Sequence, residues 1–312
     1  MQRTLYTMKI VFFGTSAFAV PSLERLAARQ QVRLCVTQPD QPQGRGLKPE
    51  PSPVALAAQR LNVPLRQLTR LDRAVLDESG AEAGVVVAYG TLIPRDALAA
   101  PRHGMLGVHP SLLPKYRGAA PVAWALLNGE TTTGVTIFRL NERLDAGDIV
   151  VQETASIEPD DDAQTLTARL ARLGAEALVR AVDMLEAGRP ACHPQDDAAA
   201  TLAPKLTKAQ GRVAWAAPAE TIARQILALV PWPGAGTTWQ RQDLKLWAAN
   251  AVPGSGGTPG TVVRVTEEMI EVATGRGTLV IREVQLAGRT RMRVREFLRG
   301  HRVNIGDHVG DA

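Results

Sequence analysis

The alternation of short apolar runs with helix-like segments over residues 9–187 is the feature that most restricts the fold of this chain. Apolar runs rich in β-branched residues predict buried strands, and the stretches between them have helical periodicity. Such an alternation is typical of an α/β fold with a doubly wound, mainly parallel sheet. We predict strands at residues 9–13, 32–37, 84–88, 105–108, 134–140 and 149–157, and helices or helical turns at 19–29, 54–61, 92–99, 122–127 and 163–187.

The last third of the chain has a different pattern. Residues 188–204 are rich in Pro, Ala and Asp and show little apolar periodicity, which is typical of a connection. After them, one helix and several short strands separated by turn residues predict a small β-barrel. The helix is expected at 219–229 and the strands at 237–239, 244–248, 260–265, 269–273 and 278–284. We therefore predict a catalytic domain at 1–188, a linker at 189–206 and a C-terminal domain at 207–312.

The distribution of charge separates the same two regions. Residues 1–200 contain 21 Lys and Arg against 22 Asp and Glu, a net charge of −1, whereas residues 201–312 contain 15 against 9, a net charge of +6. A neutral region followed by a basic one suggests that the basic part binds a large polyanion. An ordinary basic surface is the alternative explanation.

Several classes of protein do not fit the sequence. No apolar run approaches the roughly 18 residues of a membrane helix, and the N-terminus lacks the apolar core of a signal peptide. Cys35 and Cys192 are too few and too far apart for a metal cluster or a disulfide framework. Neither Gly14-Thr15-Ser16 nor Gly44-Arg45-Gly46 has the spacing of a nucleotide-binding loop. We expect a cytoplasmic protein with reduced thiols, no membrane segment and no catalytic metal.

Residues 104–148 contain the best candidate for an active site. His109 ends one short apolar run, and Asp145 follows the next one. The carboxyl ends of strands line the ligand crevice of an open α/β sheet, so we expect the two side chains to meet there. A carboxylate beside an imidazole fixes its orientation and favours its protonated form. Such a pair can polarise a carbonyl and move a proton.

Motifs along nearly the whole chain carry a family resemblance. They are KIVFFGTSAFAVPSL at 9–23, TQPDQPQGRG at 37–46, VVVAYGTLIP at 85–94, HPSLLP at 109–114, LDAGD at 144–148, APKLTKAQGRVAW at 203–215 and PWPG at 231–234. With these motifs the chain resembles the methionyl-tRNA formyltransferase family, within the folate-dependent formyltransferases. HPSLLP and LDAGD mark the broad group, and the loop at 37–46 and the C-terminal motifs favour the tRNA-directed branch.

The resemblance implies a reaction and a set of site residues. It implies transfer of a formyl group from 10-formyl-tetrahydrofolate to the α-amino group of methionyl-initiator-tRNA for translation initiation. We expect the protein to be a monomer. His109 is expected to be the oxyanion donor and proton carrier, oriented by Asp145. The C-terminal barrel is expected to be of the oligonucleotide-binding type. The folate is expected to lie, mainly through backbone groups, against Ala88, Tyr89, Gly90, Leu92, Ile93, Ser111, Leu112, Leu113 and Pro114.

Two basic elements are candidates for binding the tRNA. The proline-rich segment 38–53 carries Arg45 and Lys48, and in the family this loop engages the acceptor end of the tRNA. Near the C-terminus, the spacing of four arginines predicts one face of a helix, with Val294, Phe297 and Leu298 on the opposite face. An arginine row can follow phosphates, although a solvated helix face is the alternative. The arginines are Arg291, Arg295, Arg299 and Arg302.

The chain departs from the family at Gly107, two residues before His109, where the family has an Asn whose amide contributes to the oxyanion site. Loss of one oxyanion donor costs on the order of 10²–10³ in rate. A water, a backbone N–H or another side chain replaces it, or the enzyme is slow. Because of Gly107, a catalytically weakened relative that binds tRNA or folate stays open as an alternative. A formyltransferase for amino-sugar nucleotides is a second alternative because it shares the HPSLLP and LDAG elements, although PKLTKAQGRVAW and the basic C-terminal region count against it.

Overall fold

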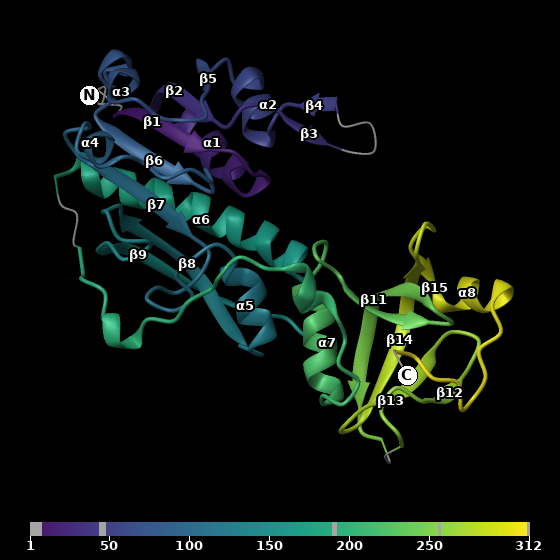
Figure 1. Cartoon of the computed structure of the whole chain (residues 1–312). Helices are drawn as coiled ribbons and strands as arrows, with labels where there is room; N and C mark the ends of the chain where they lie inside the picture. The colour runs from purple at the N-terminus through teal and green to yellow at the C-terminus, as the bar shows by residue number, and fades with distance from the viewer. Residues whose placement is uncertain (1–7, 44–47, 189–191, 255–256, 311–312) are drawn as a thin grey trace. The chain divides into compact units, whose positions relative to one another are not determined.

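A computed structural model of the chain describes residues 8–43, 48–188, 192–254 and 257–310 (Figure 1). The chain forms two compact units. The first consists of Met1–Pro121, Thr132–Ser156 and Thr167–Ala203. The second consists of Val122–Thr131, Ile157–Leu166 and Pro204–Ala312, so two short segments from the first half of the chain belong to it.

The first unit is built on a seven-stranded sheet with the order β5-β2-β1-β6-β7-β8-β9. The pairs from β5 to β7 are parallel, whereas β8 pairs antiparallel with both β7 and β9. The prediction of a mainly parallel sheet is thus confirmed. The strands are β1 (Lys9–Gly14), β2 (Gln31–Thr37), β5 (Leu65–Gln67), β6 (Ala83–Val87), β7 (Met105–His109), β8 (Thr132–Arg139) and β9 (Ile149–Ser156).

Helices connect the strands, and their ends follow from the local sequence. Ser52 accepts a hydrogen bond from the Ala55 N–H and caps α2, and Asp72 caps α3 in the same way through the Ala74 N–H. Gly80, with φ 59°, ends α3 in the left-handed conformation. The helices are α1 (Val20–Ala27), α2 (Pro53–Arg60), α3 (Arg73–Ser79), α4 (Arg95–Leu98), α5 (Pro121–Leu127) and α6 (Ala163–Glu186).

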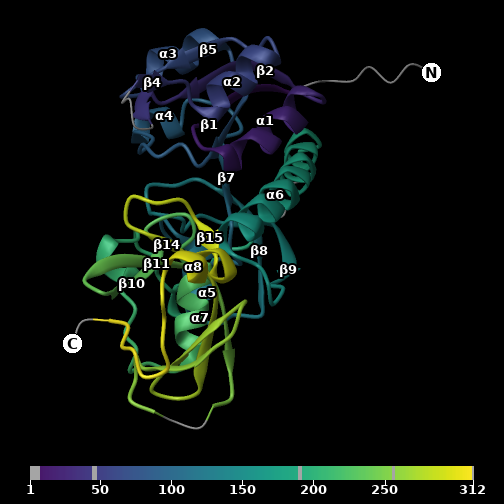
Figure 2. The ribbon, with the colours of Figure 1, turned by 90° about the vertical axis from the view of Figure 1, so that its right-hand side faces the viewer.

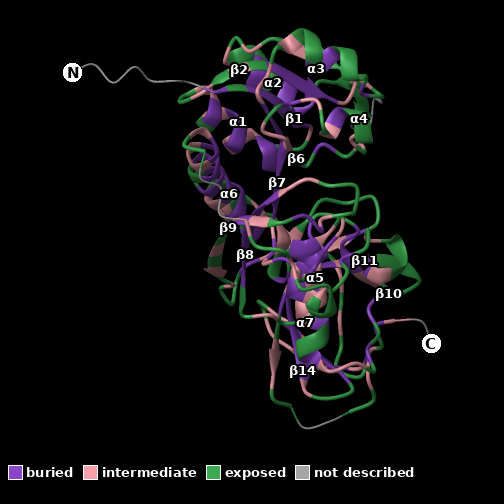
Figure 3. Ribbon diagram, turned by 90° about the vertical axis from the view of Figure 1, so that its left-hand side faces the viewer, coloured by how far each residue is buried: buried purple, intermediate pink, exposed green. Residues whose placement is uncertain are grey.

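The two faces of this sheet have different coverings. On one face, side chains of β1 and β2 pack with Val75 and Leu76 of α3 and with Ala97 of α4. On the other face, α6 approaches β7 and β8 closely at Gly174, where an added Cβ would lie 3.0 Å from Val108. Figure 3 shows that much of β7 and β8 is buried. Because side chains alternate along a strand, His109 points away from the face that carries Val108.

The second unit contains an antiparallel sheet with the order β10-β11-β14-β13-β12, and β15 pairs with β14. Figure 2 shows α8 beside β14 and β15. Trp239 and Phe297 meet edge to face, with ring centroids 5.3 Å apart, in its core. Within the described residues the strand pairing is an open path from β10 to β12. The elements are α7 (Ala219–Ala228), β10 (Ala235–Trp239), β11 (Gln242–Val252), β12 (Val262–Val265), β13 (Ile270–Ala273), β14 (Thr278–Leu286), β15 (Met292–Arg293) and α8 (Val294–Gly300).

The predicted arginine helix is only partly correct. Val294 and Phe297 are buried, as expected of an apolar face, and Arg295 and Arg299 lie on α8. Arg291 instead precedes β15, and Arg302 follows the end of the helix. The pairing of β15 with β14 takes the backbone at Met292 into a strand, so the four arginines do not form one helical row.

Candidate active site

His109 is the last residue of β7 and is buried, with 5% of its surface exposed. Its Nε2 lies 2.8 Å from the carbonyl oxygen of Tyr116. Because a carbonyl oxygen can only accept, Nε2 carries the hydrogen of the neutral ring. Nδ1 is therefore the nitrogen with a free lone pair, and it lies 3.7 Å from Oδ2 of Asp145. The structure thus brings the two predicted residues together.

Asp145 reaches His109 by a route that the sequence did not indicate. Strand β8 is antiparallel to β7, with Arg139 opposite Leu106, so its carboxyl end lies beside the start of β7. The expectation that the two side chains meet because both strands end at the same edge of the sheet is therefore wrong, although the side chains do meet. The loop after β8 brings Asp145 back, with φ 49° in the left-handed region. The backbone N–H of Gly118 donates to its Oδ2 at 2.9 Å.

The protonation of His109 is set mainly by burial. Burial lowers the pKa of the imidazole below its ordinary value, and the negative charge of Asp145 and the hydrogen bond to Tyr116 raise it by less. Asp145 thus favours the imidazolium, as expected, but burial outweighs this effect, so the ring is neutral at pH 7 in the resting protein. A neutral ring can accept a proton at Nδ1, and Asp145 stabilises the cation that this produces.

The loop that follows β6 contains the first group of expected folate contacts. Ala88 has φ 44°, and its carbonyl accepts from the Thr15 N–H at 3.2 Å. The Thr15 hydroxyl donates to the carbonyl of Tyr89 at 2.8 Å. Leu92 has 85% of its surface exposed, which is unusual for a large apolar side chain. Gly90 is exposed and Ile93 is half-buried.

Tyr89 contributes no side chain to that surface. Its ring meets Phe13 edge to face at 5.5 Å inside the core of the first unit, and only 1% of its surface is exposed. Burial raises the pKa of its hydroxyl. Among the residues that the structure describes, the hydroxyl has no hydrogen-bond partner. A ligand can therefore meet Tyr89 only through its backbone.

Residues 111–114 are the second group of expected folate contacts, and backbone groups of this segment form hydrogen bonds within the protein. The hydroxyl of Thr136 donates to the carbonyl of Ser111 at 2.7 Å and accepts from the Leu113 N–H at 3.0 Å. Gln152 donates to the carbonyl of Leu113 at 2.7 Å. Ser111 and Leu113 are buried, and Leu112 and Pro114 are half-buried. These backbone groups hold the turn beside His109.

Thr136 and Gln152 are thus site-building residues that the sequence interpretation did not single out. The available signal was a polar side chain inside a strand: Thr136 is fully buried and lies opposite His109 in the antiparallel pair of β7 and β8. A buried polar side chain in an apolar strand needs a fixed partner, and here the partner is the turn.

Gly107 lies in β7 directly opposite Phe138 of β8, and its φ is not in the positive region. A Cβ added at Gly107 would lie 2.5 Å and 2.7 Å from Cε1 and Cζ of the Phe138 ring, and 2.8 Å from Cδ1 of Leu140. Phe138 is buried, with 5% of its surface exposed. The aromatic ring therefore fills the space that an Asn side chain at this position needs.

The two basic elements differ in what the structure describes. Arg45 lies outside the described residues. The backbone of Lys48 begins β4 (Lys48–Glu50), which pairs with β3 (Gln41–Gln43) as a short antiparallel ladder. The expected tRNA-binding loop thus contains two paired strands that the sequence did not predict.

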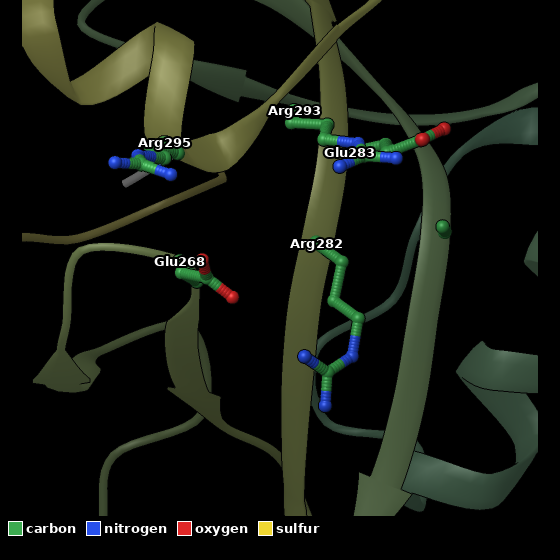
Figure 4. Close-up of a pocket in the computed structure, with 6 residues that line it drawn as sticks. Glu268, Arg282, Glu283, Arg293 and Arg295 are labelled. Carbon is green, nitrogen blue, oxygen red and sulfur yellow. The ribbon is translucent and has the colours of Figure 1, made fainter.

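The C-terminal unit carries arginines around a hollow of about 320 Å³ (Figure 4). Arg291 lies outside this hollow: its Nε donates to Glu283 at 2.7 Å, and its guanidinium lies 5.2 Å from the ring centre of Trp247. Arg299 is exposed on α8. The hollow is lined by Ala248, Glu268, Arg282, Glu283, Arg293 and Arg295.

The described residues contain neither a metal-binding cluster nor a membrane-spanning helix. Across these residues, no group of three or more His, Cys, Asp and Glu side chains is arranged to hold a metal ion. In the same part of the chain, no helix combines the length and the apolar character needed to cross a membrane.

The sequence places the chain that carries this sheet and this His–carboxylate pair in a known class of enzymes. Residues 8–182 match the model described as Formyl transferase, and residues 205–302 match that of the Formyl transferase C-terminal domain. The chain therefore belongs to the formyl transferase family. A full-length relative from Solibacter usitatus, 44% identical over 97% of this chain and 99% of its own, is named methionyl-tRNA formyltransferase. The resemblance expected from the motifs is confirmed.

Two solved structures illustrate the likeness of the fold. An N-formyltransferase from Helicobacter canadensis, in complex with folinic acid and dTDP-3-aminofucose, superposes with a TM-score of 0.69 at 15% identity, over 88% of this chain and 98% of that one. HypX from Aquifex aeolicus, in complex with tetrahydrofolic acid, superposes with a TM-score of 0.67 at 19% identity, over 97% of this chain and 51% of HypX. At these identities the likeness shows the fold alone.

Proposed function

We propose that this chain transfers the formyl group of 10-formyl-tetrahydrofolate to the α-amino group of methionyl-initiator-tRNA, as a cytoplasmic monomer. The observation that carries the proposal is the 44% identity to a methionyl-tRNA formyltransferase over 97% of this chain. That range includes the C-terminal domain, which matches its own family model at residues 205–302.

His109 is the proposed proton carrier. The neutral amine attacks the formyl carbon, so a new C–N bond forms and the carbonyl oxygen becomes negatively charged. The amine then loses a proton, and the bond from the formyl carbon to N10 of the folate breaks as N10 gains one. Nδ1 of His109 accepts the first proton because Nε2–H is already bonded to Tyr116. As an imidazolium held by Asp145 at 3.7 Å, it returns a proton to N10.

The folate is proposed to lie against residues 88–93. The exposed side chain of Leu92 offers an apolar surface to a flat pterin ring, and the exposed backbone at Ala88 and Gly90 offers polar groups. Thr15 bonds to the carbonyls of Ala88 and Tyr89 and so holds the loop in place. Residues 111–114 are the second proposed contact of the folate, and the bonds of Ser111 and Leu113 to Thr136 fix this turn beside His109.

The tRNA is proposed to meet the arginines of the C-terminal unit. Arg282, Arg293 and Arg295 face the same hollow, and Arg299 is exposed on α8 (Figure 4). Guanidinium groups gathered on one surface bind phosphates and release counterions from the nucleic acid. Arg291 is tied to Glu283 and Trp247, so its role is to support this surface. Arg45 and Lys48 are the proposed contacts of the loop at 38–53.

The decisive experiment is a formylation assay with labelled 10-formyl-tetrahydrofolate and two acceptors. We expect the label to reach methionyl-initiator-tRNA and not a dTDP-amino sugar. His109→Ala and Asp145→Ala are each expected to reduce turnover by about 10² or more, because both proton transfers pass through the pair. The Kd for tRNA is expected to stay unchanged in both variants. Transfer to the sugar alone, or near-normal turnover of His109→Ala, would contradict the proposal.

A further inference from the structure

Residues 193–203, called here the strap, are bonded to the loop that holds His109. The hydroxyl of Thr201 accepts from the Tyr116 N–H at 2.9 Å, and the Thr201 carbonyl accepts from the Arg117 N–H at 2.9 Å. The Ala203 N–H donates to the carbonyl of Arg117 at 2.7 Å. The sequence predicted a linker over this range, but the structure places the strap in the first unit, paired along residues 116 and 117.

Arg117 connects the strap to the catalytic pair. Its side chain is buried, and its Nε and Nη2 donate to Oε1 of Gln195 at 3.0 Å and 2.7 Å. Its Nη2 also lies 2.8 Å from Oδ1 of Asp197. The backbone on either side of Arg117 serves the site directly: the carbonyl of Tyr116 holds His109, and the N–H of Gly118 holds Asp145.

Gln195 completes the connection on the other side. With Oε1 accepting from Arg117, its Nε2 donates to the carbonyl of Asp145 at 2.9 Å and to the carbonyl of Gly147 at 2.7 Å. Asp145 has a left-handed backbone, with φ 49°, which a residue other than glycine adopts only when its surroundings impose it. The amide of Gln195 supplies two bonds to the segment in that conformation.

We propose that Gln195 and Arg117 are positioning residues that hold Asp145 against His109 and so keep the pair ready for proton transfer. Neither side chain has a bond to the His109 ring among the described contacts, and both act through Asp145 and the backbone of residues 116–118. The proposal rests on the proposed formyl transfer through His109. It assigns a role in the chemistry to a segment that connects the two domains in the sequence.

Gln195→Glu separates this role from a merely structural one. Glu keeps the acceptor for Arg117 and adds a charge to it, so the link between Arg117 and the strap is preserved. It loses the donor, and its carboxylate oxygen faces the carbonyls of Asp145 and Gly147. We expect kcat to fall by about tenfold to a hundredfold, as for a misplaced catalytic group, with the KM for folate and for tRNA within about twofold of wild type. A wild-type kcat would overturn the proposal.

A second variant and a control make the test independent of folding. Gln195→Ala leaves the ion pair of Arg117 with Asp197 and is expected to lower kcat to a similar extent. Arg143 also pairs with Asp197, at 2.6 Å, and has no bond to Gln195 among the described contacts. Arg143→Gln is therefore expected to keep the wild-type kcat. A normal kcat for both Gln195 variants, or an equal loss in Arg143→Gln, would show that the strap is structural only.

Assaying His109→Ala beside these variants distinguishes a failure of the positioning role from a failure of the proposed function. If His109→Ala is inactive and the Gln195 variants are normal, the positioning role is wrong and the proposed function stands. If His109→Ala is active, the proposed chemistry itself is wrong.

Discussion

Replacing Gly107 by Asn, the residue that the resemblance implies at this position, is expected to destabilise the protein unless Phe138 is replaced as well. An added Cβ at Gly107 lies 2.5 Å from Cε1 and 2.7 Å from Cζ of the buried Phe138 ring, well inside contact distance. Overpacking of a filled core typically costs about 1–3 kcal/mol. We therefore expect Gly107→Asn to lower the free energy of unfolding by about that amount and to bring no gain in kcat, because the displaced ring crowds the face of β7 and β8 that carries His109.

Phe138→Leu removes both of the ring atoms that cause the overlap. In Gly107→Asn with Phe138→Leu, the remaining close contact is Cδ1 of Leu140 at 2.8 Å, the end of a flexible side chain that can turn away. The two changes are therefore expected to couple favourably by about 1–2 kcal/mol in a double-mutant cycle. The double variant is also expected to exceed the kcat of Phe138→Leu, because it gains a donor for the oxyanion. Urea unfolding and the formylation assay measure the two effects. A coupling energy of zero, or a stable and faster Gly107→Asn single variant, would refute the reasoning.

Three further predictions follow from single features. Tyr89→Phe removes a buried hydroxyl that has no partner among the described residues, so it should raise the free energy of unfolding by about 1 kcal/mol in urea titration; a decrease would show that the hydroxyl is bonded. Because burial holds the pKa of His109 below 6.5, kcat should be constant above that pH and fall as the pH drops through the lowered pKa. The stability that depends on the neutral ring should be lost as the pH falls from 6.5, the value in the unfolded chain, to the lowered pKa of the folded protein. In Asp145→Asn, the remaining kcat should fall at a still lower pH than in the wild type, because the charge that raises the pKa of His109 is gone. A fall at higher pH would contradict the role of His109 as the titrating group. Arg295→Ala with Arg299→Ala should reduce the salt slope of tRNA binding by about one for each phosphate that the variant no longer neutralises, and an unchanged slope would show that both arginines are only solvated.

Local patterns were sufficient to predict most of the first unit. Residues 105–108 and 163–187 were predicted as a strand and a helix from apolar runs and leucine spacing, and the structure has β7 at Met105–His109 and α6 at Ala163–Glu186. Strands β3, β4 and β5 were missed because three residues carry too little periodicity to be recognised. Helix α3 was missed although Asp72 and Gly80 bound it, because its apolar face is only two buried residues wide.

The candidate site could be predicted in its residues and not in its geometry. His109 and Asp145 were found from motifs, but the antiparallel direction of β8 depends on pairing between distant segments, which no local pattern contains. The same holds for Phe138 opposite Gly107 and for Gln195 against Asp145, since both contacts join residues that are far apart in the sequence. Burial around His109 outweighs the expected effect of Asp145 on its pKa, and it could not be predicted because desolvation depends on the whole surrounding fold.

The second unit is formed by three separate segments of the chain, and this has a consequence for synthesis on the ribosome. Val122–Thr131 and Ile157–Leu166 belong to this unit together with Pro204–Ala312, and the indole of Trp124 donates to the carbonyl of Pro204 at 2.8 Å. The ribosome makes the two short segments long before the rest of their unit. The Ile157 N–H can bond to the carbonyl of Thr131 at once, whereas Trp124 must wait for Pro204 until the last third of the chain has emerged. Exchanging C-terminal halves between relatives at a single junction near residue 203 would in the same way separate each half from segments with which it evolved.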